Sequence, residues 1–146
     1  MNAHVLGPLS PSDSPVILTL YREVSAGFPS PAESFSEARL SIDDLVRLRQ
    51  PSMFLVRAKG DSMINAGIYP EDVLIVDKAR QAKSGDTVIA RIGSEFTVKT
   101  LHIGNDGRVM LVPENDAYSP IVLGDGEELE IWGVCTWNLH QLGSCA

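Results

Sequence analysis

The sequence predicts a mostly β domain, a small barrel or folded sheet, with one short helix and an extended N-terminal arm. After Pro51 the chain alternates between short runs rich in β-branched and apolar residues and clusters of Gly, Asn, Asp and Ser that favour turns. Many short strands at this spacing are typical of a barrel or folded sheet. The chain has 146 residues, of which 44% are hydrophobic, enough for one domain with its own core.

Six runs after Pro51 are predicted to be strands, and they cover residues 53–58, 73–77, 87–92, 95–101, 108–112 and 129–135. Before them, residues 41–48 are predicted to form a short helix. Ser41 can cap this helix, and Asp43 and Asp44 suit the positive end of its dipole. Pro51 follows the predicted end of the helix.

The chain up to about Ala26 is predicted to be an arm, because prolines and serines interrupt it and only residues 16–21 resemble a strand. Such a segment is far too short to fold as a DNA-reading domain. Residues 27–31, Gly-Phe-Pro-Ser-Pro, follow it and favour an extended backbone that resists helix formation.

The composition of the chain argues against several classes of function. The formal charge of −7 repels phosphate, so direct tight DNA binding is not expected. The two cysteines, Cys135 and Cys145, form no CxxC pair, which argues against a disulfide framework or a zinc site. No apolar run approaches the ~18 residues that span a bilayer, and the start lacks a basic signal region. We therefore expect a cytoplasmic protein without membrane attachment.

Several common catalytic motifs are missing from the sequence. It contains no HExxH, P-loop, GxGxxG or GxSxG pattern. Its three histidines are scattered, at positions 4, 102 and 140, so a Ser-His-Asp triad has no support. No cofactor and no metal are predicted.

Ser62 stands out by its context, because it lies in Lys-Gly-Asp-Ser-Met directly after an apolar strand. Gly60 allows the backbone to turn tightly and to approach a ligand. A serine on such a turn can present its hydroxyl, and its own amide can stabilise an oxyanion. Gly-Asp-Ser is also ordinary turn chemistry, so these residues alone leave both interpretations open.

A nucleophilic serine needs a base, and lysine is the alternative when histidine is absent. Lys99 lies in the apolar stretch 96–101, where burial would lower the pKa of its amine from about 10.4. It could instead reach solvent from a strand and pair with Glu95 on the same face. The remaining lysines have polar or turn surroundings that predict a protonated, solvated amine: Lys59, Lys78 and Lys83.

Four segments in order resemble the LexA/UmuD family of self-cleaving proteins, peptidase family S24. They are residues 60–63, 73–77, 85–90 and 95–99. Within them Ser62 and Lys99 are 37 residues apart (99 − 62 = 37). The UmuD branch matches best, since residues 27–32 and 115–121 also resemble it. The resemblance covers roughly residues 22 to 134, and it implies that the predicted barrel or folded sheet is a LexA C-terminal-like domain.

The resemblance implies a Ser-Lys dyad, with Ser62 as nucleophile and Lys99 as general base, and turn or oxyanion support from Gly60, Asp61 and Met63. It also implies that the scissile bond is Ala26–Gly27. Ala26 would fit a small pocket, and Gly27 would allow the backbone to bend into a buried site. Alanine before this glycine is the LexA-like pair, whereas the UmuD pattern has cysteine there. The implied division is an arm of residues 1–26 and a peptidase-like domain of residues 27–146.

The resemblance implies partners as well. A RecA–single-stranded-DNA filament would stimulate cleavage in the SOS response. The shortened form, as a homodimer, would join a Y-family polymerase subunit of the UmuC type to copy past DNA damage.

Two alternatives remain open. A LexA-type repressor fragment is disfavoured by the short arm and the acidic charge. The chain could also be a non-catalytic module that only binds the polymerase or RecA. In that case Ser62 and Lys99 would have a structural role and no catalytic one.

Overall fold

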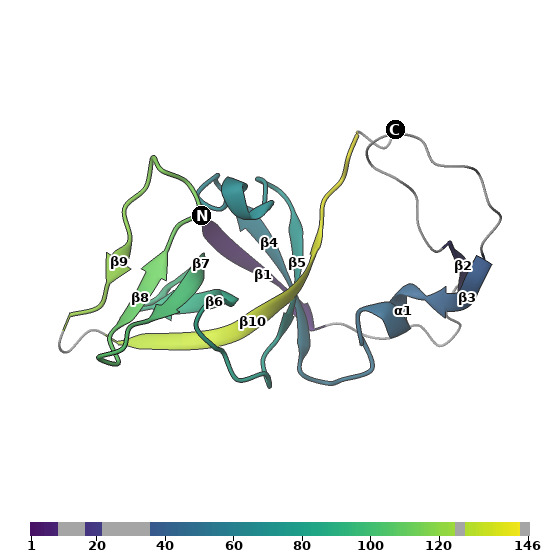
Figure 1. The fold of residues 1–146 in the computed structure, drawn as a ribbon, viewed down its shortest axis with the longest axis horizontal. Helices are drawn as coiled ribbons and strands as arrows, with labels where there is room; N and C mark the ends of the chain where they lie inside the picture. Colours follow the sequence, from purple (N-terminus) through teal and green to yellow (C-terminus); the bar gives the residue numbers. More distant parts are fainter. Residues whose placement is uncertain (9–16, 22–35, 125–127, 144–146) are drawn as a thin grey trace. The chain divides into compact units, whose positions relative to one another are not determined.

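A computed structural model describes residues 1–8, 17–21, 36–124 and 128–143 (Figure 1). The chain divides into two compact units. Met1–Leu9 and Pro51–Ala146 form one unit, and Ser10–Gln50 form the other. The predicted boundary between residues 26 and 27 lies outside the described residues and stays a prediction.

The first unit is built on one antiparallel sheet. Its strands are β1 (Asn2–Pro8), β4 (Met53–Lys59), β5 (Val73–Asp77), β6 (Thr87–Ile92), β7 (Glu95–Ile103), β8 (Val109–Val112), β9 (Ile121–Val122) and β10 (Leu129–Leu139). Their order in the sheet is β1-β4-β5-β10-β6-β7-β8-β9. β1 also pairs with β7 through Asn2 and Thr97, so the first six strands of this order close into a small barrel. β8 and β9 extend the sheet beyond β7.

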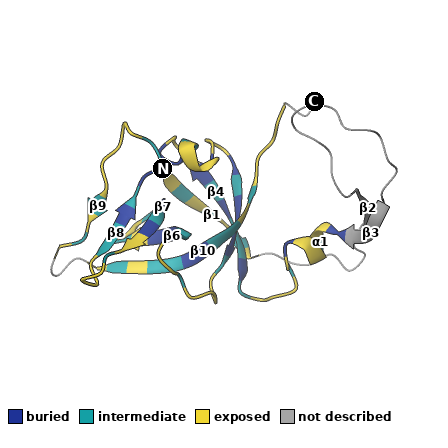
Figure 2. Cartoon of the chain, in the orientation of Figure 1, coloured by how far each residue is buried: buried dark blue, intermediate teal, exposed yellow. Residues whose placement is uncertain are grey.

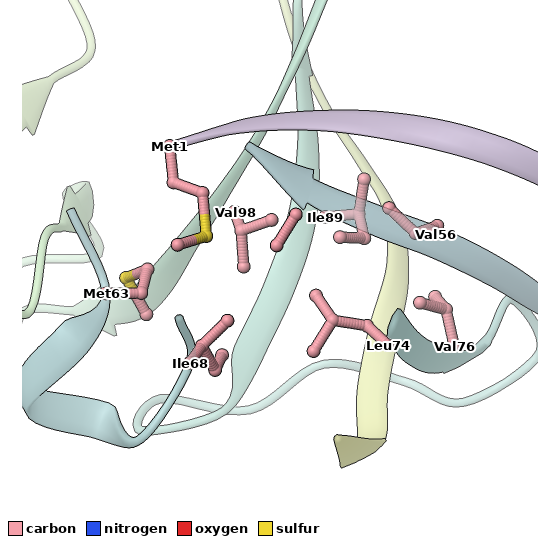
Figure 3. Close-up of a cluster of buried hydrophobic side chains, with 9 residues drawn as sticks. Met1, Val56, Met63, Ile68, Leu74, Val76, Ile89 and Val98 are labelled. Carbon is pink, nitrogen blue, oxygen red and sulfur yellow. The ribbon is translucent and has the colours of Figure 1, made fainter. Parts of the chain in front are cut away.

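The barrel forms because its strands direct alternate residues to two apolar clusters. Along β6, Ile89 belongs to one cluster, whereas Val88 and Ala90 belong to the other. Figure 2 shows these buried stretches on the central strands, and Figure 3 shows the first cluster in detail. That cluster contains Met1, Val56, Ala58, Met63, Ile68, Leu74, Val76, Ile89 and Val98. It lies directly beside the site described below.

The second unit contains a two-stranded sheet and a short helix. β2 (Ile17–Tyr21) pairs antiparallel with β3 (Ser36–Ser41), and α1 (Ile42–Leu45) follows. The hydroxyl of Ser41 accepts a hydrogen bond from the amide of Asp44 at 3.1 Å, as its predicted capping role requires. The helix is shorter than the predicted 41–48. Arg47 adopts a φ of 59°, a left-handed conformation that a continuing helix excludes.

The mostly β fold class is confirmed, and all six predicted strands are present. β7 and β10 run further than predicted, to Ile103 and Leu139. β1, β3 and β9 were not predicted. A 3₁₀ turn, η1 (Ile64–Ala66), follows β4. Within the described ranges, no helix is long and apolar enough to cross a membrane.

Candidate active site

Ser62 lies on the turn between β4 and η1. Gly60 enters this turn with a φ of 85°, in the left-handed region that glycine adopts without steric cost. Met63 follows Ser62 and is fully buried in the apolar cluster. The turn therefore has a buried side chain directly after the serine, which holds the backbone of Ser62 in place.

A second segment of the chain holds this turn from the other side. The amide of Glu114 donates to the carbonyl of Ser62 at 2.7 Å. The side-chain amide of Asn115 donates to the carbonyl of Asp61 at 2.9 Å, and the Tyr118 hydroxyl donates to the Asp61 carboxylate at 2.5 Å. Residues 114–118 follow β8, so the turn that carries Ser62 is held by a segment more than 50 residues later in the sequence.

Lys99 reaches Ser62 from β7. Its amine donates to the Ser62 hydroxyl at 3.1 Å, to the Thr97 hydroxyl at 2.9 Å and to the Val98 carbonyl at 3.0 Å. Lys99 is only 5% exposed, and this burial lowers the pKa of its amine, while a hydrogen bond with the Met1 amine acts in the opposite direction. The structure thus contradicts the interpretation in which Lys99 reaches solvent and pairs with Glu95. The Lys99 amine is buried and bonds to Ser62, whereas Glu95 is exposed at the start of β7.

Met1 completes the site, and the sequence analysis did not identify it. Its amine donates a hydrogen bond to the Ser62 hydroxyl, and its carbonyl accepts from the Val98 amide at 3.1 Å and from the Thr97 hydroxyl at 2.7 Å. Burial, and then the neighbouring Lys99, lower the pKa of the Met1 amine to about 5. Figure 3 shows the Met1 side chain directed into the apolar cluster. Ser62 is consequently fully buried in this state.

Thr97 was also missed, although the strand pattern contains a signal for it. Residues two apart on a strand share a face, so a polar residue at position 97 lies beside Lys99. A cavity of about 290 Å³ adjoins both residues and is also lined by Phe96, Tyr118 and Ile121. The site therefore has free space next to the lysine.

The structure brings together five of the seven predicted site residues: Gly60, Asp61, Ser62, Met63 and Lys99. Ala26 and Gly27 lie outside the described residues. The three histidines are separated, as expected. His4 lies on β1, His102 is exposed on β7, and His140 pairs with Asp72 at 2.6 Å.

Comparison with known proteins shows the family to which the chain belongs. The Peptidase S24-like family model matches residues 16–136. The chain is 40% identical to Protein SamA of Salmonella typhimurium over 139 residues, which cover 93% of this chain and 96% of that protein. It is 35% identical to Protein MucA of Escherichia coli over 125 residues, covering 85% and 84% of the two chains.

The LexA repressor of Bordetella pertussis is 37% identical to the chain over 119 residues. This match covers 82% of the chain but only 54% of the repressor, so the chain spans about half the length of that relative. The family match and the two near full-length relatives agree with the predicted resemblance: the chain belongs to the peptidase S24-like family.

Proposed function

We propose that the chain is a self-cleaving serine protease that cuts its own Ala26–Gly27 bond, with Ser62 as nucleophile and Lys99 as general base. The observation that supports this most strongly is the 3.1 Å contact between the Lys99 amine and the Ser62 hydroxyl in a buried place. Burial favours the neutral amine, which is the form that can accept a proton. Membership of the S24-like family supports the same assignment.

The proposed reaction has two stages. Neutral Lys99 takes the hydroxyl proton of Ser62, whose oxygen attacks the carbonyl carbon of Ala26. The Ser62 amide stabilises the resulting oxyanion, and the ammonium of Lys99 protonates the departing nitrogen of Gly27. An ester between Ser62 and Ala26 remains, and water activated by Lys99 hydrolyses it.

Gly60, Asp61 and Met63 act in this proposal by shaping the turn. Gly60 supplies the left-handed backbone, and Met63 fixes the turn to the core. Asp61 binds Tyr118 and Asn115 and so connects the turn to the segment after β8. None of the three needs to contact the reacting atoms.

The products are an arm of residues 1–26 and a domain of residues 27–146. We propose, from the family resemblance and the near full-length match to SamA and MucA, that the domain works as a homodimer. It would join a Y-family, UmuC-like polymerase in SOS translesion synthesis, and a RecA–single-stranded-DNA filament would stimulate the cleavage. The net charge of −7 agrees with a role through protein partners rather than direct DNA binding.

Mass determination after incubation at alkaline pH tests the protease. We expect a fragment that begins at Gly27, with the same fragment formed faster in the presence of RecA and single-stranded DNA. Ser62→Ala and Lys99→Ala should each abolish it while leaving the fold intact by circular dichroism. The proposal fails if the parent chain yields no such fragment, or if Ser62→Ala yields it equally well.

A pull-down tests the partner role separately. The processed domain should retain a UmuC-like polymerase subunit, and the uncleaved chain should retain RecA filament. Partner binding without any self-cleavage would instead favour the non-catalytic binding module. If the chain binds neither partner, the proposed polymerase role is wrong, whereas the proposed protease activity is unaffected.

A further inference from the structure

Strand β1 lies beside the dyad and pairs with both β4 and β7, and the place that it occupies between them is called the groove below. It pairs antiparallel with β4, with Asn2 opposite Lys59 and Val5 opposite Val56. Ala3 and Val5 pack on the apolar cluster, whereas Asn2 and His4 are exposed. The groove thus accepts an extended segment by adding it to the edge of β4, with every second side chain turned inward.

This strand also covers the reacting groups. Ser62 is 0% exposed and Lys99 5% exposed, and the Met1 amine donates to the Ser62 hydroxyl. A peptide carbonyl cannot approach the Ser62 oxygen while Met1 occupies this place. Any cleavage by Ser62 therefore requires β1 to leave the groove first.

We infer that the groove between β4 and β7, filled here by β1, is the binding place of the chain that follows the scissile bond, so that β1 and the segment beginning at Gly27 compete for it. This inference rests on the proposed function. It adds the register in which the substrate binds and identifies the element that must leave.

The register follows from the position of Met1. The Met1 nitrogen contacts the Ser62 oxygen. If another residue takes the place of Met1, the peptide bond that joins it to the preceding residue therefore lies against the Ser62 oxygen. If that bond is Ala26–Gly27, then Gly27 takes the place of Met1. The next residues follow in order along β4, and Pro31 takes the place of Val5.

Backbone direction provides an independent check on this register. The Met1 carbonyl faces β7, where it accepts from the Val98 amide. The amide and carbonyl of one strand residue point to the same side, and the side alternates along the strand. Asn2 and His4 therefore direct their backbone groups toward β4, whereas Ala3, like Met1, faces β7 beside the Asn2–Thr97 pair, and Val5 faces away from β4.

In the inferred register, Phe28 and Ser30 fall at the places that face β4. Pro29 and Pro31 fall at the places that face away. Proline has no amide hydrogen to donate, so both prolines fall where β4 requires none, although Pro29 forgoes the bond that an amide at the place of Ala3 can make to β7. A register in which Phe28 takes the place of Met1 would put Pro29 and Pro31 at the places of Asn2 and His4, against β4, and would remove two hydrogen bonds there.

Side-chain size explains why β1 holds the groove in the resting chain. Met1 is 8% exposed and fills a buried place beside Met63 and Val98, whereas Gly27 has no side chain to put there. The substrate segment is thus the weaker occupant. Self-cleavage then proceeds at a rate set by the small fraction of molecules in which β1 has left.

Loosening β1 tests the competition. His4→Pro removes an amide that faces β4, and its side chain is exposed, so little else changes. Under alkaline conditions we expect this variant to cleave itself at least about fivefold faster than the parent, because a lost buried hydrogen bond shifts an equilibrium by about that factor. His4→Thr keeps the amide and should cleave at the parent rate. A synthetic peptide of residues 1–8 should slow His4→Pro again.

Changing the other competitor tests the register without touching the barrel. Ser30→Pro removes an amide that would face β4, so it should slow cleavage at least about fivefold, whereas Ser30→Ala should not. Equal rates for His4→Pro and the parent, no effect of the peptide, or equal rates for Ser30→Pro and Ser30→Ala would each overturn the inference. In those cases the proposed function would still hold if the fragment that begins at Gly27 forms and Ser62→Ala abolishes it. A complete lack of cleavage in every variant would overturn both.

Discussion

The Lys99 amine lies 3.1 Å from the Ser62 hydroxyl, although the two residues are 37 apart in the sequence. Ser62 follows β4 and Lys99 lies in β7. These two strands do not pair with each other, but β1 pairs with both. The dyad thus lies at the point where the ring of strands closes.

The first prediction concerns pH. Because burial lowers the pKa of Lys99, the neutral amine is present at a lower pH than for an exposed lysine. The initial rate of self-cleavage, followed by mass determination, should rise with pH and level off below about 10.4, the ordinary lysine value. Lys99→Arg should be inactive across the whole range, because arginine keeps its proton. A rate that is independent of pH would argue against lysine as the base.

The second prediction concerns Thr97, which accepts from the Lys99 amine at 2.9 Å and donates to the Met1 carbonyl at 2.7 Å. Thr97→Val keeps the shape of the side chain but removes the hydroxyl, so the lysine loses one of the groups that orient it. We expect the plateau rate of self-cleavage to fall about tenfold, equivalent to about 1.4 kcal/mol in the barrier. Thr97→Ser should retain most of the rate. Equal plateau rates for the valine and serine variants would show that orientation by this hydroxyl is unimportant.

Local patterns predicted the central strands well, because apolar β-branched runs such as residues 73–77 and 87–92 have few alternatives. β1 was missed for a physical reason. Asn2–Pro8 has a weak strand pattern of its own and becomes a strand only because β4 offers it an edge. The same limit applies to the site. Sequence context predicted a site at Ser62 and Lys99, which the structure places in contact, but Met1 joins them only through long-range pairing that no local pattern contains.

The third prediction concerns Asp72, a carboxylate whose side chain is 3% exposed. Burial alone would raise its pKa, but hydrogen bonds from His140, the Tyr69 amide and Asn138 outweigh burial and hold the pKa below its usual value. A depressed folded-state pKa stabilises the fold above the unfolded value, about 3.9, and this contribution is lost as pH falls through the folded pKa. Asp72→Ala should therefore lower the free energy of unfolding at pH 7 by about 2–4 kcal/mol.

Urea unfolding of the Asp72 variant and the parent at pH 7 and pH 3 measures this effect. The difference between the two proteins should shrink at pH 3, because below about 3.9 the carboxyl of the unfolded chain takes up a proton that the folded protein disfavours. His140→Ala should cost less, because the His140 side chain is 39% exposed. A difference that is the same at both pH values would show that the charge of Asp72 does not contribute.

The fourth prediction concerns Gly133 in β10. A Cβ atom there would lie 2.5 Å from Cγ1 of Val76 and 3.3 Å from the carbonyl oxygen of Asp77. Val76 is fully buried and cannot move without disturbing the core. Gly133→Ala should therefore lower the free energy of unfolding by about 1–3 kcal/mol, measured by urea unfolding. Gly124→Ala, whose Cβ would meet no atom within 4 Å, should change stability by less than about 0.5 kcal/mol. Similar values for the two variants would contradict the overpacking argument.

The last prediction concerns Asn115, which connects the segment after β8 to the turn of Ser62. Its side-chain nitrogen donates to the Asp61 carbonyl at 2.9 Å, and its oxygen accepts from the Ala117 amide at 3.0 Å. Asn115→Asp keeps the second bond but places a carboxylate against the Asp61 carbonyl, so the turn loses a donor and gains a repulsion. Self-cleavage should slow about tenfold, while the free energy of unfolding falls by only about 1 kcal/mol, since Asn115 is half-buried at the surface of the site. Ala117→Asp, at an exposed neighbour, adds the same negative charge as a control and should cleave at the parent rate. If Asn115→Asp also cleaves at the parent rate, the turn holds Ser62 without help from this segment, and Met63 in the core is the sufficient restraint.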